Sequence, residues 1–328
     1  MSKHNYKLPF PAIPDMPPEI INAIDDGDLL LFVGAGVSKL IGYPLWFELG
    51  RNLAEKASDF GLISLPEKEI LLGGQFSPME IVTILCKKFN ERNPSLGREM
   101  VIKELSPSDK IDSKIALKIA NYLSAYNATI VTTNADESLQ VGPLKGRIVV
   151  TNFRQFEFEK HCKYSIIHLH GDIRDPGGMV FTSEEYAKAY NVEADFGKNL
   201  KALFEHRWTI LFMGYGVSEF ELLRYFLPYK EDKVRRLFML DGYLAKDRIK
   251  YEFDKEYYQS LGITLLPYSR EKNDYKQLLR VLKRWDKDVK EKTLAASSAL
   301  EENIAHIVLQ RPFREGVEAI ERMVNENG

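Results

Sequence analysis

The sequence has little cysteine and no surplus of either charge, and both shortages exclude classes of protein. Its 328 residues include two cysteines, Cys86 and Cys162, and no CxxC pair. Neither a disulfide framework nor a four-cysteine zinc module can be built from them. The 45 Lys and Arg residues against 47 Asp and Glu residues leave a net charge of -2. No overall electrostatic attraction therefore favours nucleic acid or an anionic membrane, and we expect no direct nucleic-acid binding.

Long apolar segments are absent as well. No stretch approaches the roughly 18 apolar residues of a membrane-spanning helix, and the N-terminal MSKHNYKLPFPAIP has no run of signal-peptide length. We therefore expect a cytoplasmic protein that does not bind membranes. With 45% hydrophobic and 28% charged residues, the composition is that of an ordinary globular chain. At about 150 residues per domain, the length predicts two domains, or one large domain with appended pieces.

Short continuous apolar runs recur along the chain and predict buried strands. The first, Leu29–Val33, ends at Gly34 and has the character of a central strand covered on both faces. Further runs of this kind lie at Ala128–Val131, Ile148–Val150, Tyr164–Leu169, Ile210–Met213, Leu237–Leu240 and Ile263–Leu266. Helical patterns fall between several of them. This alternation predicts an α/β fold with a doubly wound parallel sheet.

Other segments depart from this alternation and predict the domain boundaries. Residues 1–27 form a Pro-rich lead-in and a short helix, EIINAIDDGD, that ends at Gly27. The main domain then covers residues 28–274 and contains a helical insertion at about 60–126. Helical patterns around and within that insertion lie at Trp46–Ser58, Met79–Asn90, Arg98–Leu105 and Ser113–Tyr122.

The tail, residues 275–328, is predicted to be helical. Leu278, Leu282, Trp285 and Val289 form one apolar stripe, and two more helices are predicted before and after Arg311-Pro312, as a helical hairpin. A C-terminal helix with an apolar stripe needs another protein surface to bury that stripe. We therefore expect a homo-oligomer, a partner subunit, or a longer natural protein of which this tail begins a helical region.

Two motifs at predicted strand ends have the chemistry to bind a nucleotide. GAGVS, residues 34–38, allows a tight turn in which backbone N–H groups meet phosphate oxygens; a turn without any ligand is the alternative. The third glycine of a GxGxxG fingerprint would fall at Lys39, which disfavours a hydride-transferring enzyme. TTNAD, residues 132–136, offers hydroxyl, amide and carboxylate groups for sugar hydroxyls and a carboxamide. Alternatively, Asn134 or Asp136 caps a helix that starts near Glu137.

Two further motifs follow later strands. HLHGD, residues 168–172, places His170 at a strand exit, where a histidine can act as a general base; His168 fits a structural role better. The pair lacks a third metal ligand, so we expect no metal. GYGVS, residues 214–218, precedes a predicted helix at 219–226 and is a natural phosphate site, although Ser218 could equally be an N-cap. Two such turns without a Walker lysine fit a dinucleotide better than a nucleoside triphosphate.

In this order and spacing, the four motifs resemble those of the sirtuin superfamily. The resemblance covers about residues 25–242, and Gly42-Tyr43-Pro44 extends it. It implies a Rossmann-like fold that binds NAD and breaks the bond between nicotinamide and ribose. It also implies that Asn134 and His170 are catalytic, and that Asp136 and Asn134 hold carboxamide and ribose. The NAD-binding residues implied are Gly34, Ala35, Gly36, Ser38, Thr133, Asp136, Gly214, Tyr215, Gly216 and Ser218.

Departures from the family pattern refine this expectation. The chain has neither the cysteines nor the room between His170 and Gly214 for the zinc module of protein deacylases. Leu45 and Phe47 replace the family's aspartate and arginine, and Thr133 and Gly216 also differ from it. The chain thus looks like the zinc-free sirtuin-like effectors of bacterial anti-phage defence, which hydrolyse NAD.

The expected function is NAD+ hydrolysis to nicotinamide and ADP-ribose, as a NAD-depleting effector of abortive infection. The expected partners are NAD, further copies of the chain, and an activating phage protein or partner subunit. Three alternatives stay open: an NAD-dependent protein deacylase, a non-catalytic NAD or ADP-ribose sensor, and a cyclase.

Overall fold

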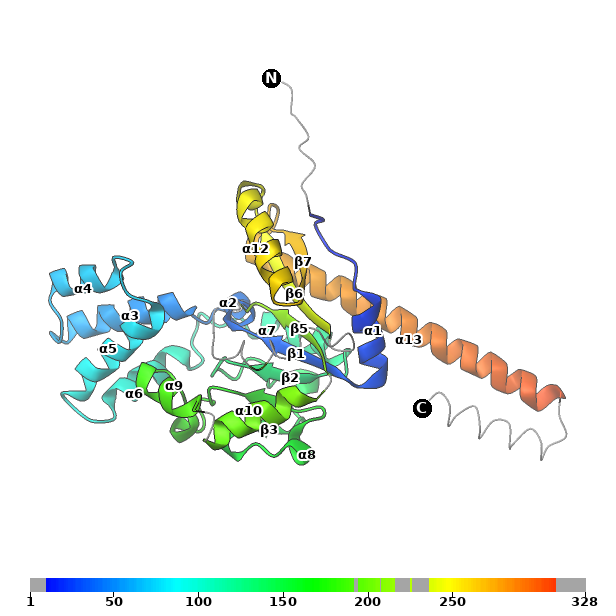
Figure 1. Ribbon diagram of the computed structural model, residues 1–328, viewed down its shortest axis with the longest axis horizontal. Helices are drawn as coiled ribbons and strands as arrows, with labels where there is room; N and C mark the ends of the chain where they lie inside the picture. The colour runs from blue at the N-terminus through cyan, green and yellow to red at the C-terminus, as the bar shows by residue number, and fades with distance from the viewer. Residues whose placement is uncertain (1–9, 192–193, 207, 216–224, 226–235, 311–328) are drawn as a thin grey trace, which may run out of the picture.

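The structure, a computed structural model, describes residues 10–191, 194–206, 208–215, 225 and 236–310. A parallel sheet lies at its centre, with the strand order β3-β4-β2-β1-β5-β6-β7 (Figure 1). The strands are β1 (Leu29–Val33), β2 (Thr129–Thr132), β3 (Val149–Val150), β4 (Ile166–His168), β5 (Thr209–Met213), β6 (Arg236–Tyr243) and β7 (Ile263–Ser269). Each predicted apolar run forms a strand, and the predicted α/β fold with a doubly wound, Rossmann-like parallel sheet is confirmed.

The helices of the described residues cover the sheet and extend it. Before the insertion lie α1 (Pro18–Asp26) and α2 (Ala35–Ile41). Next comes α3 (Trp46–Asp59), and the segment at about 60–126 that was predicted as an insertion contains α4 (Leu65–Leu72), α5 (Pro78–Asn90), α6 (Leu96–Leu105) and α7 (Ser113–Ser124). The remaining α-helices are α8 (Phe158–His161), α9 (Ser183–Ala189), α10 (Asp195–Glu205), α12 (Arg248–Ser260) and α13 (Gln277–Gln310).

Alternate residues of β1 enter two different cores. Leu29, Leu31 and Val33 join the cluster formed with α1, α2, α7 and α13. Leu30 and Phe32 join the cluster formed with α9, α10 and α12. Both faces of the strand are therefore covered, which explains why its sequence is apolar without alternation. None of the described helices has the length and apolar content needed to cross a membrane.

The strand order reverses direction at β1. The chain winds from β1 to β2, β3 and β4 on one side, and returns to build β5, β6 and β7 on the other. Ligands of open α/β sheets bind outside the carboxyl ends of the strands at such a switch point. The ends of β1 and β5 carry the two glycine motifs, which places both at this position.

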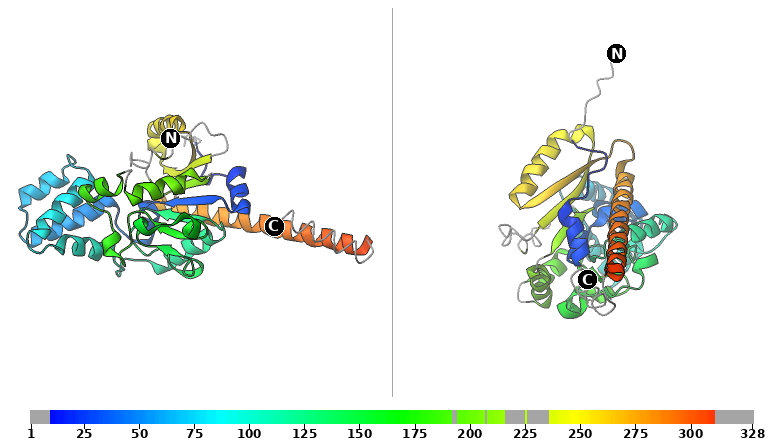
Figure 2. Two further views of the ribbon diagram at one scale, coloured as in Figure 1. Left: turned by 60° about the horizontal axis from the view of Figure 1, so that its bottom comes forward. Right: turned by 90° about the vertical axis from the view of Figure 1, so that its right-hand side faces the viewer.

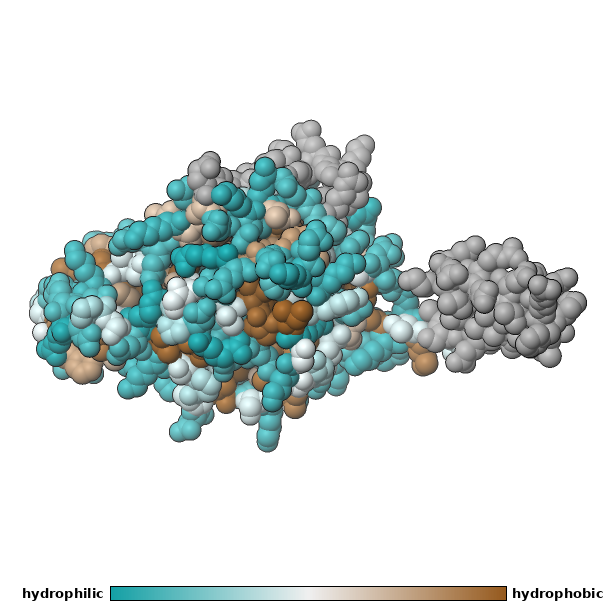
Figure 3. Space-filling view, turned by 90° about the horizontal axis from the view of Figure 1, so that it is seen from below, coloured by the Kyte–Doolittle hydropathy of each residue, from teal (hydrophilic) through white to brown (hydrophobic). Residues whose placement is uncertain are grey.

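Helices α3 to α6 form a third core cluster, which also includes Ala135, Met179 and Phe181. Leu53, Ile81, Leu85 and Phe89 from α3 and α5 pack together, and α4 and α6 complete this cluster. In Figure 1 these helices form the end of the molecule opposite the projecting part of α13. By contrast, α7 packs under the sheet with α13. The face seen in Figure 3 is mainly hydrophilic, with hydrophobic residues in separate patches.

The tail differs from its prediction. The separate helix predicted before Arg311-Pro312 is wrong, because α13 runs unbroken from Gln277 to Gln310. The linking segment, KEKTLAASSA, contains no proline or glycine and is rich in good helix formers, so the helix continues where the apolar stripe ends. Figure 2 shows α13 projecting beyond the sheet. The predicted second arm of the hairpin lies in residues 311–328, outside the described residues.

Candidate functional site

The two glycine turns at the switch point contact each other through their backbones. Gly34 N–H donates to the Met213 carbonyl over 3.0 Å, and Gly36 N–H donates to the Gly214 carbonyl over 2.8 Å. A Cβ on Gly34 would lie 2.5 Å from the Gly214 oxygen, and Gly214 itself has a φ of 60°. Glycine is therefore required for this close approach. Because both amides serve the neighbouring turn, they are not the groups that would hold a phosphate.

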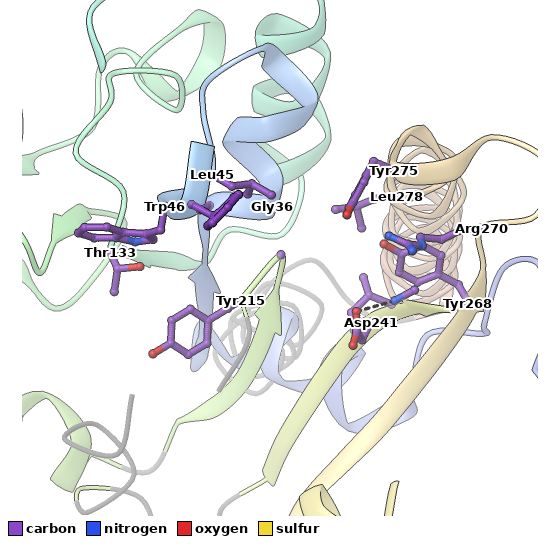
Figure 4. A pocket seen from close by; sticks show the side chains of 15 residues that line it. Gly36, Leu45, Trp46, Thr133, Tyr215, Asp241, Tyr268, Arg270, Tyr275 and Leu278 are labelled. Carbon is purple, nitrogen blue, oxygen red and sulfur yellow. Dashed lines mark hydrogen bonds between the residues drawn. The ribbon is translucent and has the colours of Figure 1, made fainter. Parts of the chain in front are cut away.

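A cleft of about 390 Å³ opens beside these turns. In Figure 4, Trp46 and Thr133 lie on one side and Asp241, Tyr268 and Arg270 on the other. The complete lining consists of Ala35, Gly36, Leu45, Trp46, Phe47, Thr133, Gly214, Tyr215, Leu240, Asp241, Gly242, Tyr268, Arg270, Tyr275 and Leu278. Of the predicted NAD-binding residues, Ala35, Gly36, Thr133, Gly214 and Tyr215 thus share one cleft.

The far wall of the cleft contains groups that sequence reasoning missed. Burial raises the pKa of Asp241 in β6, and its Oδ1 accepts the N–H of Gly242 over 2.7 Å. Arg270 follows β7, and its guanidinium lies 4.6 Å from the ring centre of Tyr275. No glycine motif marks the ends of β6 and β7. The signal in the sequence that could have indicated this wall is Asp241, an acidic residue that directly follows the apolar run Leu237–Leu240.

A smaller recess adjoins the cleft and contains the polar residues of the first two motifs. The two hollows share Ala35, Trp46 and Thr133. The amide nitrogen of Asn134 donates to the Gly34 carbonyl over 3.0 Å and to Ser38 Oγ over 2.9 Å. Ser38 Oγ in turn donates to Asp136 Oδ2 over 2.7 Å. A buried network therefore joins β1 to β2.

This network leaves one polar atom of Asn134 uncommitted. Both hydrogens of its amide nitrogen are used by the protein, while Oδ1 forms no hydrogen bond with the residues that the structure describes. Asn134 lines the recess and is 9% exposed. Oδ1 is thus a fixed acceptor at the edge of the cleft, suited to a sugar hydroxyl or a water.

The alternative of a helix cap at Asn134 or Asp136 is wrong. The chain from Asp136 runs through bends and turns to a 3-10 segment at Gly142–Leu144, so no α-helix starts near Glu137. Asp136 Oδ1 accepts the N–H of Ser138 over 3.0 Å, which stabilises the turn. The polar side chains of this motif therefore serve the recess and its turn.

His168 is a hydrogen-bonded histidine of the core. Its Nδ1 donates to the Asn134 carbonyl over 2.7 Å, and its Nε2 lies 3.1 Å from the amide nitrogen of Gln140. Gln140 also donates to Asp172, which pairs with Arg174. Burial lowers the pKa of His168, so the ring is neutral. Its position fixes the backbone of Asn134.

His170 is held apart from both hollows. Its side chain is fully buried and lines neither the cleft nor the recess. Tyr190 Oη lies 2.7 Å from Nε2, and Tyr186 Oη lies 3.0 Å from Nδ1. Burial lowers the pKa of His170 to about 3. A base with that pKa is weak at neutral pH, so this conformation is not one that accepts a proton from a bound ligand.

Part of the later glycine motif lies outside the described residues. This applies to Gly216, Ser218 and most of the helix predicted at 219–226. Tyr215 is described; it is one of the residues that line the cleft, and its ring packs 4.7 Å from that of Phe32. Across the described ranges, no cluster of three or more His, Cys, Asp or Glu side chains has the arrangement of a metal site.

Comparison with known proteins finds a family model and relatives to which parts of this chain are similar. Residues 128–266 match the family model described as a SIR2-like domain. The chain is 26% identical over 273 residues to a protein named defense-associated sirtuin 2 from Bacillus subtilis. It is 26% identical over 290 residues to a protein named NAD(+) hydrolase ThsA from Bacillus cereus (strain MSX-D12), and 27% identical over 215 residues to a protein of that name from Enterococcus faecium.

These alignments cover much of this chain and less of its relatives. They span 80%, 83% and 62% of the chain, in the same order, but 25%, 57% and 40% of the relatives. The chain therefore spans only part of the length of these relatives, between 25% and 57%.

Proposed function

We propose that this chain, which carries a SIR2-like domain at residues 128–266, is an NAD+ hydrolase that cleaves the bond between nicotinamide and ribose. One observation carries the proposal: the buried network of Ser38, Asn134 and Asp136 adjoins a cleft at the switch point of the sheet. The names of two relatives, NAD(+) hydrolase ThsA, support the choice of substrate.

The polarity of the two hollows favours one orientation of the dinucleotide. The carboxamide of nicotinamide would meet Asp136 and Ser38 in the recess, where carboxylate and hydroxyl oxygens pair with its amide. The rest of the dinucleotide would lie in the cleft. There the guanidinium of Arg270 offers charge to phosphate, and Asp241 offers an acceptor to ribose hydroxyls.

The proposed chemistry needs little acid assistance. Nicotinamide in NAD is a cationic leaving group, so it departs with the electron pair of the C–N bond and leaves an oxocarbenium-like ribose. Water then adds to that carbon, and its proton passes to a base. Asn134 Oδ1 would orient the water or the ribose, and His170, once it has left the closed position described above, would accept the proton. Positioning by Asn134 and base catalysis by His170 each contribute roughly 10² or more in rate.

Identification of the products tests the reaction. The purified full chain is incubated with NAD, and the products are separated by chromatography and weighed by mass spectrometry. Nicotinamide and ADP-ribose in equal amounts are expected. A cyclic ADP-ribose product would contradict hydrolysis, and a requirement for an acylated peptide would indicate a deacylase.

The closed position of His170 favours a second candidate, a non-catalytic sensor of NAD or ADP-ribose. Such a protein would bind through the same cleft without turnover. Calorimetry with NAD, run beside the product assay, separates the two. Binding with no nicotinamide release, at any protein concentration, identifies a sensor.

The cellular role follows from the proposed activity. We propose a NAD-depleting effector of anti-phage defence, in line with the name of the relative from Bacillus subtilis. Such an enzyme needs control, so a homo-oligomer and an activating phage protein or partner subunit remain our proposals. Expression of the chain in bacteria should lower cellular NAD, and the presence of its trigger should increase that loss.

A further inference from the structure

His170 is enclosed by a pair of tyrosines from one short helix. Tyr186 and Tyr190 are both 5% exposed, and their rings stack 5.6 Å apart. Their hydroxyls meet opposite nitrogens of the imidazole, Tyr186 at Nδ1 and Tyr190 at Nε2. A neutral imidazole donates from one nitrogen and accepts at the other. One tyrosine therefore receives the ring proton, and the other donates its own.

The two tyrosines differ in how firmly they are held. Tyr186 lies inside α9, whose start is fixed by a capping box between Thr182 and Glu185. Glu185 is also paired with Arg98 of α6, and Ser183 N–H donates to Thr83 of α5 over 2.9 Å. The helical insertion therefore anchors the half of α9 that carries Tyr186.

Tyr190 is placed at the other end of the same helix. It is the C-terminal capping residue of α9, where the backbone leaves the helix after Ala189. Helix ends open more readily than helix interiors. Of the two hydroxyls on His170, that of Tyr190 is therefore the one that can be exchanged for another group.

The hydroxyl of Tyr190 has the chemistry of a substrate group. At 2.7 Å, it meets Nε2 as a ribose hydroxyl would when giving its proton to a base. We propose that Tyr190 occupies Nε2 of His170 in the substrate-free protein and gives way to a ribose hydroxyl, while Tyr186 stays at Nδ1 and orients the ring. Tyr186 and Tyr190 are thus positioning residues, and this inference rests on the proposed function.

Nuclear magnetic resonance of the full chain tests the hydrogen bonds directly. Histidine is labelled with ¹⁵N, and the His170 signals are assigned by their loss in His170→Gln. The proposal expects the proton on Nδ1 in the wild type, with Nε2 as acceptor. Tyr190→Phe should move the Nε2 shift and keep the proton on Nδ1, whereas Tyr186→Phe should weaken that preference. A proton on Nε2 in the wild type overturns the proposal.

Steady-state kinetics with NAD as substrate provide a second test of the proposal. Tyr190→Phe should lower KM about tenfold because the substrate no longer displaces a hydrogen bond, whereas Tyr186→Phe should lower kcat about tenfold with KM kept. Tyr126→Phe is the matched control, since the buried Tyr126 hydroxyl has no hydrogen-bond partner among the described residues. An unchanged or raised KM in Tyr190→Phe overturns the proposal.

The two tests also separate this inference from the proposed function. If the wild type releases no nicotinamide, the hydrolase assignment fails. The magnetic-resonance experiment still shows which nitrogen of His170 carries the proton. In that case ADP-ribose is added as the probe. In the wild type one hydroxyl replaces another, whereas in Tyr190→Phe the ribose hydroxyl meets an open Nε2, so ADP-ribose should move the Nε2 shift further, and at lower concentration, in Tyr190→Phe than in the wild type. An Nε2 shift that ADP-ribose leaves unchanged in Tyr190→Phe contradicts the exchange of hydroxyls.

Discussion

At the residue scale, neighbours in the fold decide why a glycine is needed at Gly34 and what the rings of His168 and His170 contact. Gly34 must be a glycine because the backbone of Gly214 lies against it, whether or not a phosphate also approaches the turn. His168 and His170 are two positions apart, yet one ring supports Asn134 and the other points to α9. The side chains of the HLHGD motif, residues 168–172, therefore lie in separate environments.

Replacement of Gly34 by alanine should destabilise the protein by about 2–3 kcal/mol, because the new Cβ meets the backbone of the second turn at 2.5 Å. Gly146→Ala is the control, since nothing lies within 4 Å of a Cβ at that position. Urea unfolding of both variants measures the difference. Equal stabilities of the two would show that the turns do not touch.

The buried histidines predict a loss of stability in acid. The pKa of His170 falls from 6.5 to about 3 on burial, and burial also lowers that of His168. Unfolded histidine takes up a proton below pH 6.5 while the folded ring stays neutral, so the unfolded chain binds more protons. Stability is therefore full above pH 6.5 and falls as the pH drops below it. For His170 the loss continues toward pH 3, by up to about 1.4 kcal/mol per pH unit.

We would measure the change of the unfolding free energy with pH by urea unfolding at pH 7 and pH 5, for the wild type and for His170→Gln. The variant should lose less stability on acidification than the wild type. The same slope in both proteins would mean that His170 is already protonated, or exposed, in the folded state.

At the level of elements, apolar runs and helical periodicity predicted most of the fold. The strands follow from runs such as Leu29–Val33, because a parallel strand covered on both faces leaves no place for polar residues. The single long α13 was not predicted, since a helix can outlast its apolar stripe. The far wall of the cleft was missed because Asp241 and Arg270 come together only through the pairing of β6 with β7.

The docking of α13 depends on one large side chain. Trp285 is fully buried and donates its indole N–H to the Pro14 carbonyl over 2.8 Å. Trp285→Ala should cost about 3–5 kcal/mol, because it leaves a cavity and an unpaired carbonyl. Leu294→Ala on the same helix is the control; that side chain is 69% exposed, and the cost should stay within about 0.5 kcal/mol. Similar costs for the two would contradict the docking.

The whole molecule combines a central sheet, a helical insertion beside the cleft, and a helix that projects beyond the sheet (Figure 2). The helices between β1 and β2 contact the site in two ways: Trp46 of α3 lines the cleft, and Arg98 of α6 pairs with Glu185 of α9. If copies of the chain associate as we propose, nicotinamide release per chain should rise with protein concentration. A constant specific activity, with a monomer by light scattering, would exclude that form of control.

The central claim is that NAD is cleaved at the recess that contains Asn134. The most direct measurement is nicotinamide release from NAD by the wild type, Asn134→Ala and Asn199→Ala. Asn199 also loses a side-chain hydrogen bond, to the Phe153 carbonyl, away from the cleft. We predict that Asn134→Ala lowers release at least about 100-fold, while Asn199→Ala stays close to the wild type. Wild-type release by Asn134→Ala would contradict the account.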